Sequence, residues 1–323
     1  MNKKKRRQKT TSQATEKKSG VNLKFLVAII SAVLLLAIVY FFATSTQPTS
    51  AQGSDTWTVS KDGVLSYPEN RGKVDVQVLN ITNGSNYTLE TISFQSKDYT
   101  VEGLLRIPLS DKKVPAVVIL PGATVPMEGT QGLAEIFSNM GIASLGIEQR
   151  NLGGVDPQYD YELFTEGKEP IEHKMVFDAL RSVDVLRQDP RIDATRIAIV
   201  GESNGGRFAI IAAAIDPEIR GVIGISTSGY DMESQLAIAH ITDETKIRFY
   251  RSIDPDTYLG LLPPRKLVMM HSVNDTIIPI DMAKKTFDKA SEPKQFYEVT
   301  TGTHGFSEGM RVPLENEIKQ MFG

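Results

Sequence analysis

The hexapeptide at residues 201–206, Gly-Glu-Ser-Asn-Gly-Gly, limits the possible folds of this chain more than any other stretch. It follows an apolar run at residues 197–200 that predicts a buried strand, and it precedes an apolar run at residues 208–215 that predicts a buried helix. A Gly-x-Ser-x-Gly pattern between a strand and a helix is typical of a nucleophile elbow, a sharp turn that exposes the serine hydroxyl at the end of a sheet. The alternative is an ordinary glycine-rich turn, so the interpretation depends on whether Ser203 has catalytic partners.

Strand-like and helix-like runs alternate from residue 115 to the end of the chain. The predicted strands cover residues 115–120, 143–147, 197–200, 222–225, 267–270 and 296–299, and the predicted helices cover 128–140, 171–187, 206–215 and 312–322. Upstream, alternating residues 74–79 predict a first strand, and residues 89–95 and 99–107 predict a hairpin. This order predicts an α/β fold with a mostly parallel sheet, helices on both faces, and a site at the carboxyl ends of the strands.

A serine nucleophile needs a general base, and the base needs a carboxylate to orient it. Of the four histidines, His304 is the candidate base because it lies in a glycine-rich loop directly after the last predicted strand. His271 ends a strand and is expected to pack or to hydrogen-bond. Asp275 follows the penultimate strand and is the candidate acid, with an Asx turn or helix cap as its alternative role. The order Ser203, Asp275, His304, each after a successive strand, is one of the known orders of a catalytic triad.

Acyl transfer also needs hydrogen-bond donors for the oxyanion of the tetrahedral intermediate. The backbone N–H of Asn204, at the start of the helix after the nucleophile, is the first candidate. The second is the backbone N–H of Ala123, in the loop after the strand at residues 115–120. Gly122 permits a close approach of the backbone. Gly122 and Glu202 are predicted to contact the substrate.

Residues 99–322 resemble the α/β-hydrolase superfamily, and are most similar to single-domain esterases related to dienelactone hydrolase, acetyl xylan esterase and the catalytic domain of prolyl oligopeptidases. The matching pieces are Pro121-Gly-Ala, residues 193–206, Asn274-Asp275 with Pro279, and His304-Gly-Phe306. The resemblance implies an α/β-hydrolase fold with a mostly parallel eight-stranded sheet. It also implies hydrolysis of an ester or related acyl bond in a small molecule, without metal or organic cofactor.

Three features depart from the patterns of these relatives. Dienelactone hydrolases use a cysteine nucleophile, and this chain has no cysteine. Carboxylesterases carry a His-Gly-Gly oxyanion motif, where this chain has Pro121-Gly-Ala. Prolyl oligopeptidases usually carry a β-propeller, for which the segment before Tyr99 is too short. The last difference weighs against a peptidase.

The N-terminal region predicts a membrane anchor. Residues 1–22 are polar and basic, and residues 25–43 form a run of 19 residues without a charge, close to the length that crosses a bilayer. We therefore expect a cytoplasmic tail at residues 1–22, an uncleaved transmembrane segment at residues 23–43, a linker at residues 44–72 and the hydrolase domain at residues 73–323. A cleaved signal peptide, cut near Thr49-Ser-Ala, is the alternative. This organisation places the catalytic domain outside the cytoplasm, in contact with the bilayer only through its anchor.

Charge and cysteine content exclude several classes of function. The formal net charge is −3, but residues 1–24 carry nine of the 36 basic and one of the 39 acidic side chains, which leaves −11 on the rest. An acidic body argues against nucleic acid as a partner. The absence of cysteine excludes disulfides, a cysteine nucleophile and cysteine-ligated zinc.

The segment that would decide the substrate is an insert at residues 230–264, which is rich in apolar and aromatic side chains and is expected to form short helices over the site. Arg150 has two possible roles, as a ligand for a substrate carboxylate or as a member of a structural salt bridge. Besides ester hydrolysis, three functions remain open: a serine peptidase, an acyltransferase, and a catalytically silent domain used for binding.

Overall fold

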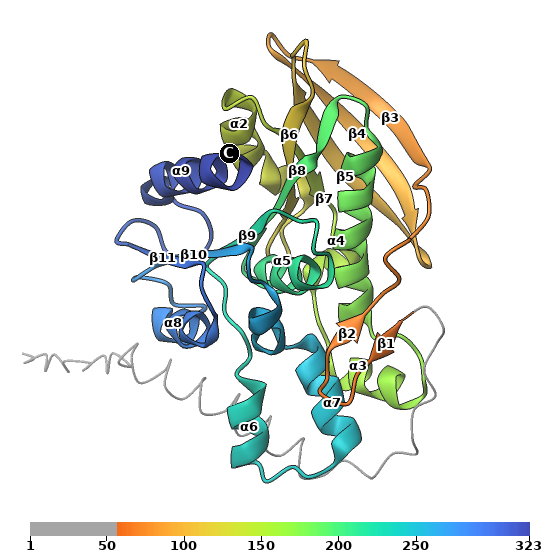
Figure 1. The fold of residues 1–323 in the computed structure, drawn as a ribbon, viewed down its shortest axis with the longest axis vertical. Helices are drawn as coiled ribbons and strands as arrows, with labels where there is room; N and C mark the ends of the chain where they lie inside the picture. The colour runs from red at the N-terminus through yellow and green to blue at the C-terminus, as the bar shows by residue number, and fades with distance from the viewer. Residues whose placement is uncertain (1–56) are drawn as a thin grey trace, which may run out of the picture. The chain divides into compact units, whose positions relative to one another are not determined.

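The computed structural model of this chain describes residues 57–323 (Figure 1). The predicted cytoplasmic tail and membrane anchor, residues 1–43, lie outside the described residues. Within residues 57–323, no helix combines the length and the apolar character needed to cross a bilayer.

A nine-stranded sheet runs through the described part of the chain, in the order β11-β10-β9-β8-β6-β7-β5-β4-β3. All pairings from β11 to β7 are parallel, and those that join β7, β5, β4 and β3 are antiparallel. The strands are β3 (Val76–Asn83), β4 (Tyr87–Ser96), β5 (Tyr99–Pro108), β6 (Val114–Leu120), β7 (Ala143–Ile147), β8 (Ile192–Glu202), β9 (Gly221–Ile225), β10 (Lys266–Ser272) and β11 (Lys294–Val299). A separate short ribbon pairs β1 (Thr58–Val59) with β2 (Leu65–Ser66).

The expected sheet of eight strands is wrong by one strand. The eight strands were implied by the family resemblance, whereas the strand predicted at residues 74–79 is present as β3, which pairs with β4 from Val76 opposite Phe94 to Asn83 opposite Thr88. It lies at the edge of the sheet, and seven of its eight residues are exposed. Such a strand is held by its hairpin hydrogen bonds rather than by burial, so its apolar pattern stops before the strand does.

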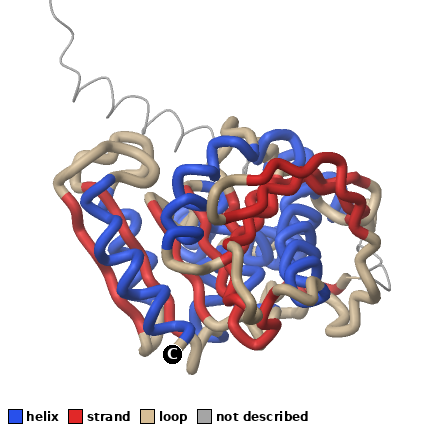
Figure 2. Tube along the Cα trace, turned by 90° about the horizontal axis from the view of Figure 1, so that it is seen from above, coloured by secondary structure: helices blue, strands red, loops and turns tan. Residues whose placement is uncertain are grey.

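Helices cover both faces of the sheet, as Figure 2 shows. On one face, α2 (Gln131–Asn139) and α9 (Arg311–Phe322) bury Phe137, Leu314 and Ile318 against the strands. On the other, α4 (Ile171–Gln188) and α5 (Asn204–Ile215) pack against each other and against β8. The helix expected at residues 128–140 is split, because a 3-10 turn, η1 (Met127–Thr130), precedes α2.

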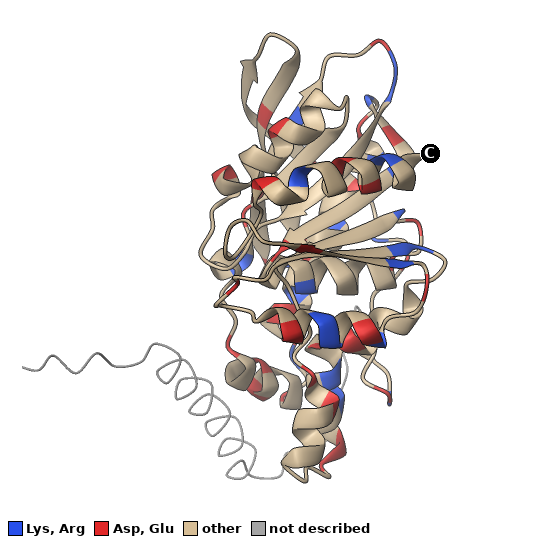
Figure 3. Cartoon of the chain, turned by 90° about the vertical axis from the view of Figure 1, so that its left-hand side faces the viewer, with Lys and Arg blue, Asp and Glu red and all other residues tan. Residues whose placement is uncertain are grey.

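The central strands are apolar on both faces because each face is covered. Residues 197–200 of β8 and the whole of β9 are buried. Charged side chains gather instead on the exposed faces of helices and on loops (Figure 3). The continuous Ile, Val and Ala runs of these strands are the pattern that a buried parallel sheet requires.

The insert between β9 and β10 forms three short elements, α6 (Met232–Ile238), α7 (Glu244–Ile253) and η3 (Pro255–Leu261). Phe249 and Tyr258 are fully buried within it. The ring of Phe249 also lies 5.5 Å, centroid to centroid, from that of Tyr161 in α3 (Pro157–Thr165). The remaining elements are η2 (Arg150–Gly153), α8 (Ile280–Lys289) and η4 (Glu308–Met310).

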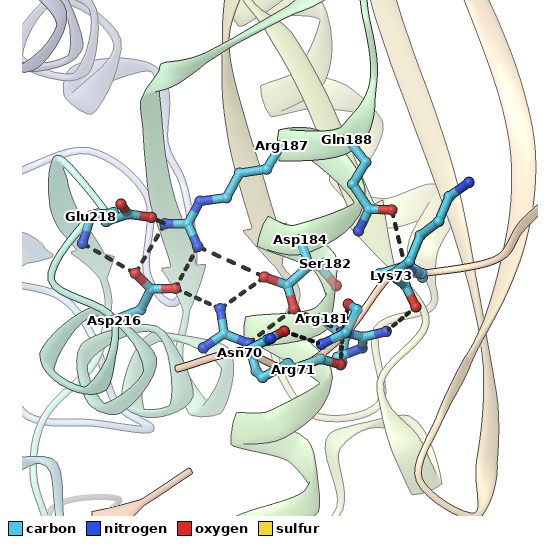
Figure 4. Close-up of polar contacts among 12 residues, drawn as sticks. Asn70, Arg71, Lys73, Arg181, Ser182, Asp184, Arg187, Gln188, Asp216 and Glu218 are labelled. Atoms are coloured by element: carbon cyan, nitrogen blue, oxygen red, sulfur yellow. Dashed lines mark hydrogen bonds and ion pairs between the residues drawn. The ribbon is translucent and has the colours of Figure 1, made fainter. Parts of the chain in front are cut away.

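A buried ion-pair network fastens the segment before β3 to α4 and to the turn after α5 (Figure 4). Arg71 Nη2 lies 2.8 Å from Asp184 Oδ1 and 2.7 Å from Asp216 Oδ2, and the Arg71 and Asp216 side chains are each 5% exposed. Arg181 donates to the carbonyls of Arg71 and Gly72 at 2.8 and 2.9 Å. Buried charges of this kind are tolerated only when each one is paired, so the network fixes the position of this segment.

Replacing Arg71 should destabilise the protein. Arg71→Met leaves two buried carboxylates with one cation fewer, and the loss of one partner of a buried pair costs about 3 kcal/mol. Urea denaturation of the full chain measures this loss. Arg196→Met is the matched control, because its pair with Asp193 is only partly buried, and it should change the free energy of unfolding by less than about 1 kcal/mol. Equal effects of the two substitutions would contradict a structural role for the network.

A second buried polar group lies where α4 meets the insert. Glu172 is 2% exposed, its Oε1 has no hydrogen-bond partner, and the hydroxyl of Tyr230 lies 3.4 Å from its Oε2. Burial is the main cause that raises the pKa of Glu172 to about 8, and the neighbouring Asp160 raises it further. The carboxyl group is therefore protonated in the folded protein at neutral pH.

This raised pKa makes stability depend on pH. Between the unfolded pKa of about 4.3 and the folded pKa, only the unfolded state releases the proton, so the contribution of Glu172 to stability falls as pH rises. The stability of Glu172→Gln relative to the parent protein should therefore increase from pH 5 to pH 8, by about 3 kcal/mol. Chemical denaturation across this range measures the difference. The exposed Glu166→Gln variant serves as the control, and a similar slope for both variants would disprove the expectation.

Candidate active site

Ser203 occupies a strained turn between β8 and α5. Its backbone has φ 51° and ψ −119°, a region that non-glycine residues rarely adopt. A Cβ on Gly201 would lie 2.3 Å from the carbonyl oxygen of Gly205, and a Cβ on Gly205 would lie 2.4 Å from that of Leu120. Both flanking positions therefore require glycine, and the turn has the geometry expected of a nucleophile elbow.

Two hydrogen bonds hold the backbone of this turn. The Ser203 N–H donates to the carbonyl of Ile225 at 2.8 Å, and the hydroxyl of Thr227 donates to the Ser203 carbonyl at 2.7 Å. Both partners come from the end of β9 and the residues just after it. Strained residues held in this way are common at functional sites.

Asp275 and His304 meet at the same edge of the sheet. Asp275 follows β10 and His304 follows β11, and His304 Nδ1 lies 2.8 Å from Asp275 Oδ2. The other carboxylate oxygen accepts the N–H groups of Ile277 and Ile278 at 2.9 and 3.0 Å. With the carboxylate at Nδ1, the proton of a neutral His304 lies on Nδ1, which leaves Nε2 as a proton acceptor.

His271 lies next to the same carboxylate but has a different environment. Its Nε2 is 3.3 Å from Asp275 Oδ2 and hydrogen-bonds the carbonyl of Ile278 at 2.7 Å. Burial is the main cause that lowers its pKa. His271 is thus a neutral, buried ring that packs under Asp275, in agreement with its expected packing role, while the exposed side of the pair belongs to His304.

The loop after β6 borders Ser203. A Cβ on Gly122 would lie 3.3 Å from the Cβ of Ser203. The Thr124 N–H donates to the carbonyl of Leu152 at 2.7 Å, and the Gln149 side chain donates to the carbonyl of Pro121. Ala123, between these anchored residues, and Asn204, the first residue of α5, therefore lie in segments that flank the nucleophile. As the first helical residue, Asn204 has no partner for its N–H within the helix.

Glu202 faces the loop that carries His304. A Cβ on Gly305 would lie 3.2 Å from its Oε2, and the carboxylate accepts the backbone N–H of Phe306. Burial raises the pKa of Glu202, while Phe306 and His304 act in the opposite direction. The structure therefore places Glu202 against residues 304–306, and its predicted contact with substrate stays a prediction.

The sequence analysis missed the side-chain contacts of Asn204 and the position of Arg207. Asn204 Nδ2 donates to the carbonyl of Gly153 at 2.7 Å, which ties α5 to η2. Arg207, one turn into α5, approaches Asn204 and Tyr230. Sequence spacing gave no signal for Arg207, because Ser203 precedes α5 with a non-helical backbone and the two residues are not a helical i, i+4 pair.

Arg150 is a structural residue. Its guanidinium lies 2.5 Å from Asp178 Oδ2 and 2.7 Å from Asp98 Oδ1, and it also donates to the carbonyl of Ser96. Of its two predicted roles, the salt bridge is confirmed. The guanidinium of Arg150 is already paired with two carboxylates, so it is not suited to bind the carboxylate of a substrate.

A cavity of about 1140 Å³ in the described region lies away from these residues. Its walls include Arg220, which precedes β9, and Lys266, the first residue of β10, so it opens at the amino ends of the strands. Neither Ser203 nor Asp275 nor His304 lines it. Within residues 57–323, no three His, Asp or Glu side chains are grouped so as to hold a metal ion.

Comparison with known proteins agrees with this geometry. In structure, the chain is similar to an acetyl xylan esterase from Paenibacillus sp. R4, with a TM-score of 0.64 and 17% identity over 78% of this chain and 90% of that chain. In sequence, it is 32% identical to the thiohydrolase aneE of Aspergillus aculeatus over 130 residues, which cover 39% of each protein. It is 26% identical over 153 residues to the uncharacterized protein YfhR of Escherichia coli O157:H7, covering 45% of this chain and 51% of YfhR.

The matches to the two curated relatives thus span about half of their length or less. The match to a family model is longer. The sequence model of acetyl xylan esterase (AXE1) matches residues 83–257, which make up more than half of the chain and include the strained turn at Ser203. The fold is that of the α/β hydrolases, and the chain belongs to the acetyl xylan esterase family.

Proposed function

We propose that this protein hydrolyses carboxylic esters through an acyl-enzyme on Ser203. The observation that carries the proposal is the hydrogen bond between His304 Nδ1 and Asp275 Oδ2, at the same sheet edge as the strained Ser203 turn. Membership of the acetyl xylan esterase family supports the same reaction class.

The reaction has two steps. In the first, Ser203 Oγ attacks the ester carbonyl while His304 Nε2 takes its proton, and the resulting imidazolium is stabilised by Asp275. The backbone N–H groups of Asn204 and Ala123 bind the oxyanion. His304 then gives its proton to the departing alcohol. In the second step, water attacks the acyl-enzyme with His304 as base, and the acid is released with Ser203 regenerated.

The neutral, buried His271 supports this assignment of the base. A second imidazole that could be charged next to Asp275 would compete with His304 for the carboxylate. The bond from His271 Nε2 to the Ile278 carbonyl occupies that nitrogen, so the carboxylate orients His304 alone.

We also propose that the uncharged run at residues 25–43 anchors the protein in the cell membrane, with the basic tail in the cytoplasm and the hydrolase domain on the other side. Protease treatment of intact cells from which the cell wall or outer membrane has been removed tests this membrane topology, because the protease digests the hydrolase domain only if that domain lies outside the cytoplasm. Full protection of the domain would exclude this orientation.

Ser203→Ala should abolish turnover of p-nitrophenyl acetate, with a loss in kcat on the order of 10⁴-fold or more, and should also abolish labelling by a fluorophosphonate probe. Ser110→Ala, in an exposed loop, is the matched control and should be labelled and active. Normal labelling of Ser203→Ala would exclude Ser203 as the nucleophile. Turnover of peptide anilides in preference to esters would favour a peptidase instead, and no labelling of the folded parent protein would indicate a silent domain.

Asp275→Asn should lower kcat by on the order of 10⁴-fold, because an amide at this position favours the wrong tautomer of His304. The measurement is steady-state turnover of an oxyester and of the matching thioester, since one relative is named a thiohydrolase. An activity within tenfold of the parent protein would contradict the role assigned to Asp275.

A further inference from the structure

Arg207 is a cation held beside the candidate nucleophile. It lies in the first turn of α5, four residues after Ser203, which itself precedes the helix. Its Nη1 lies 3.3 Å from Oδ1 of Asn204, the residue proposed to bind the oxyanion through its N–H. The charge is therefore in contact with the residue that directly follows Ser203.

The guanidinium of Arg207 is fixed in position by neutral groups. Its Nε donates to the carbonyl of Ser228 at 2.9 Å, and its central carbon lies 4.0 Å from the centroid of the Tyr230 ring. An arginine stacked on an aromatic ring keeps its charge and loses little further freedom when it binds a ligand. The side chain is only partly buried.

No carboxylate of the described residues forms an ion pair with this cation. Over residues 57–323, Arg207 takes part in no ion pair, whereas the similarly buried Arg71, Arg150 and Arg187 are each paired with at least one aspartate. Glu172 lies beyond Tyr230 and is buried, with one unpartnered oxygen; burial raises its pKa to about 8, while the charge of Arg207 acts in the opposite direction. A partly buried arginine without a counter-ion, next to a reacting centre, has a vacant position for an anion.

We propose that Arg207 is an anion-binding subsite, and that the substrates of this enzyme are esters that carry a free carboxylate near the scissile bond. This proposal rests on the proposed ester hydrolysis at Ser203. A carboxylate matches the planar fork of a guanidinium, and its charge would be compensated only when it is bound. Arg207 would then select the substrate without taking part in the transfer of protons.

A purely structural role for Arg207 predicts a different outcome. As a clamp between α5 and residues 228–230, it would affect the turnover of all esters equally when removed. As an anion subsite, it would affect charged esters alone. Matched ester pairs that differ only in one charge therefore separate the two roles.

The test uses two such pairs with rigid rings, in which the carboxylate cannot attack the ester itself. The pair 4-acetoxybenzoate and methyl 4-acetoxybenzoate places the charge on the alcohol side. The pair mono-4-nitrophenyl terephthalate and its methyl ester places it on the acyl side. For at least one pair, kcat/KM of the parent protein should be higher for the anionic ester, and this preference should fall as salt is raised.

Arg207→Gln should lower kcat/KM for the preferred anionic ester by ~10- to 100-fold, mainly through KM, and should change the neutral ester by less than about threefold. Arg207→Lys should retain part of the preference. Arg196→Gln, which removes the same charge far from Ser203, should leave both esters unchanged. Equal losses for the anionic and the neutral ester would overturn the proposal in favour of a clamp.

The proposal can also be tested without a variant. Benzoate should inhibit hydrolysis of neutral esters by the parent protein more strongly than benzamide does, and equal inhibition by both would overturn the subsite. Failure of the underlying esterase function has a different result, namely no Ser203-dependent turnover of either member of either pair.

Discussion

The active-site region depends on one constraint, the left-handed backbone of Ser203. A residue in such a conformation costs of order 1–3 kcal/mol and persists only when its surroundings impose it. Here they do, since Gly201 and Gly205 allow contacts that no side chain would permit, and two hydrogen bonds from the β9 end hold the turn. The strained turn at Ser203 is thus held in place by the packed strands beneath it.

The topology of the sheet also determines where His304 and Asp275, the candidate base and acid, lie relative to Ser203. β8, β10 and β11 run parallel, with β9 between β8 and β10, so the residues that follow them emerge at one edge. Asp275 is held there by two backbone N–H groups, and it in turn orients His304. The three loops that carry Ser203, Asp275 and His304 are far apart in the sequence. They lie close together in the fold because each one follows a strand that ends at the same edge of the sheet.

Local patterns were sufficient to predict the elbow, the alternation of strands and helices, and the pairing of Asp275 with His304, because each depends on a short segment and the direction of a strand. They could not reveal the last residues of β3, which lie at an exposed edge and carry no apolar signal. They also missed the network around Arg71, Asp184 and Asp216, because Arg71 lies more than a hundred residues before both of its partners. Burial and charge pairing between distant segments are properties of the fold.

The two arginines near the site illustrate this limit. In the sequence, Arg150 had two possible roles, as a ligand for a substrate carboxylate or as a member of a structural salt bridge. In the fold, Asp178 and Asp98 pair with its charge, so a substrate anion would have to compete with the buried carboxylate of Asp178. Arg207 differs from Arg150 in this respect. A carbonyl, an amide and an aromatic ring hold its guanidinium in position, and no carboxylate of the described residues forms an ion pair with it. An arginine that is already paired with carboxylates gains little free energy when it binds a further anion, whereas an arginine without an ion pair gains more. For this reason Arg207 is better suited than Arg150 to select the substrate.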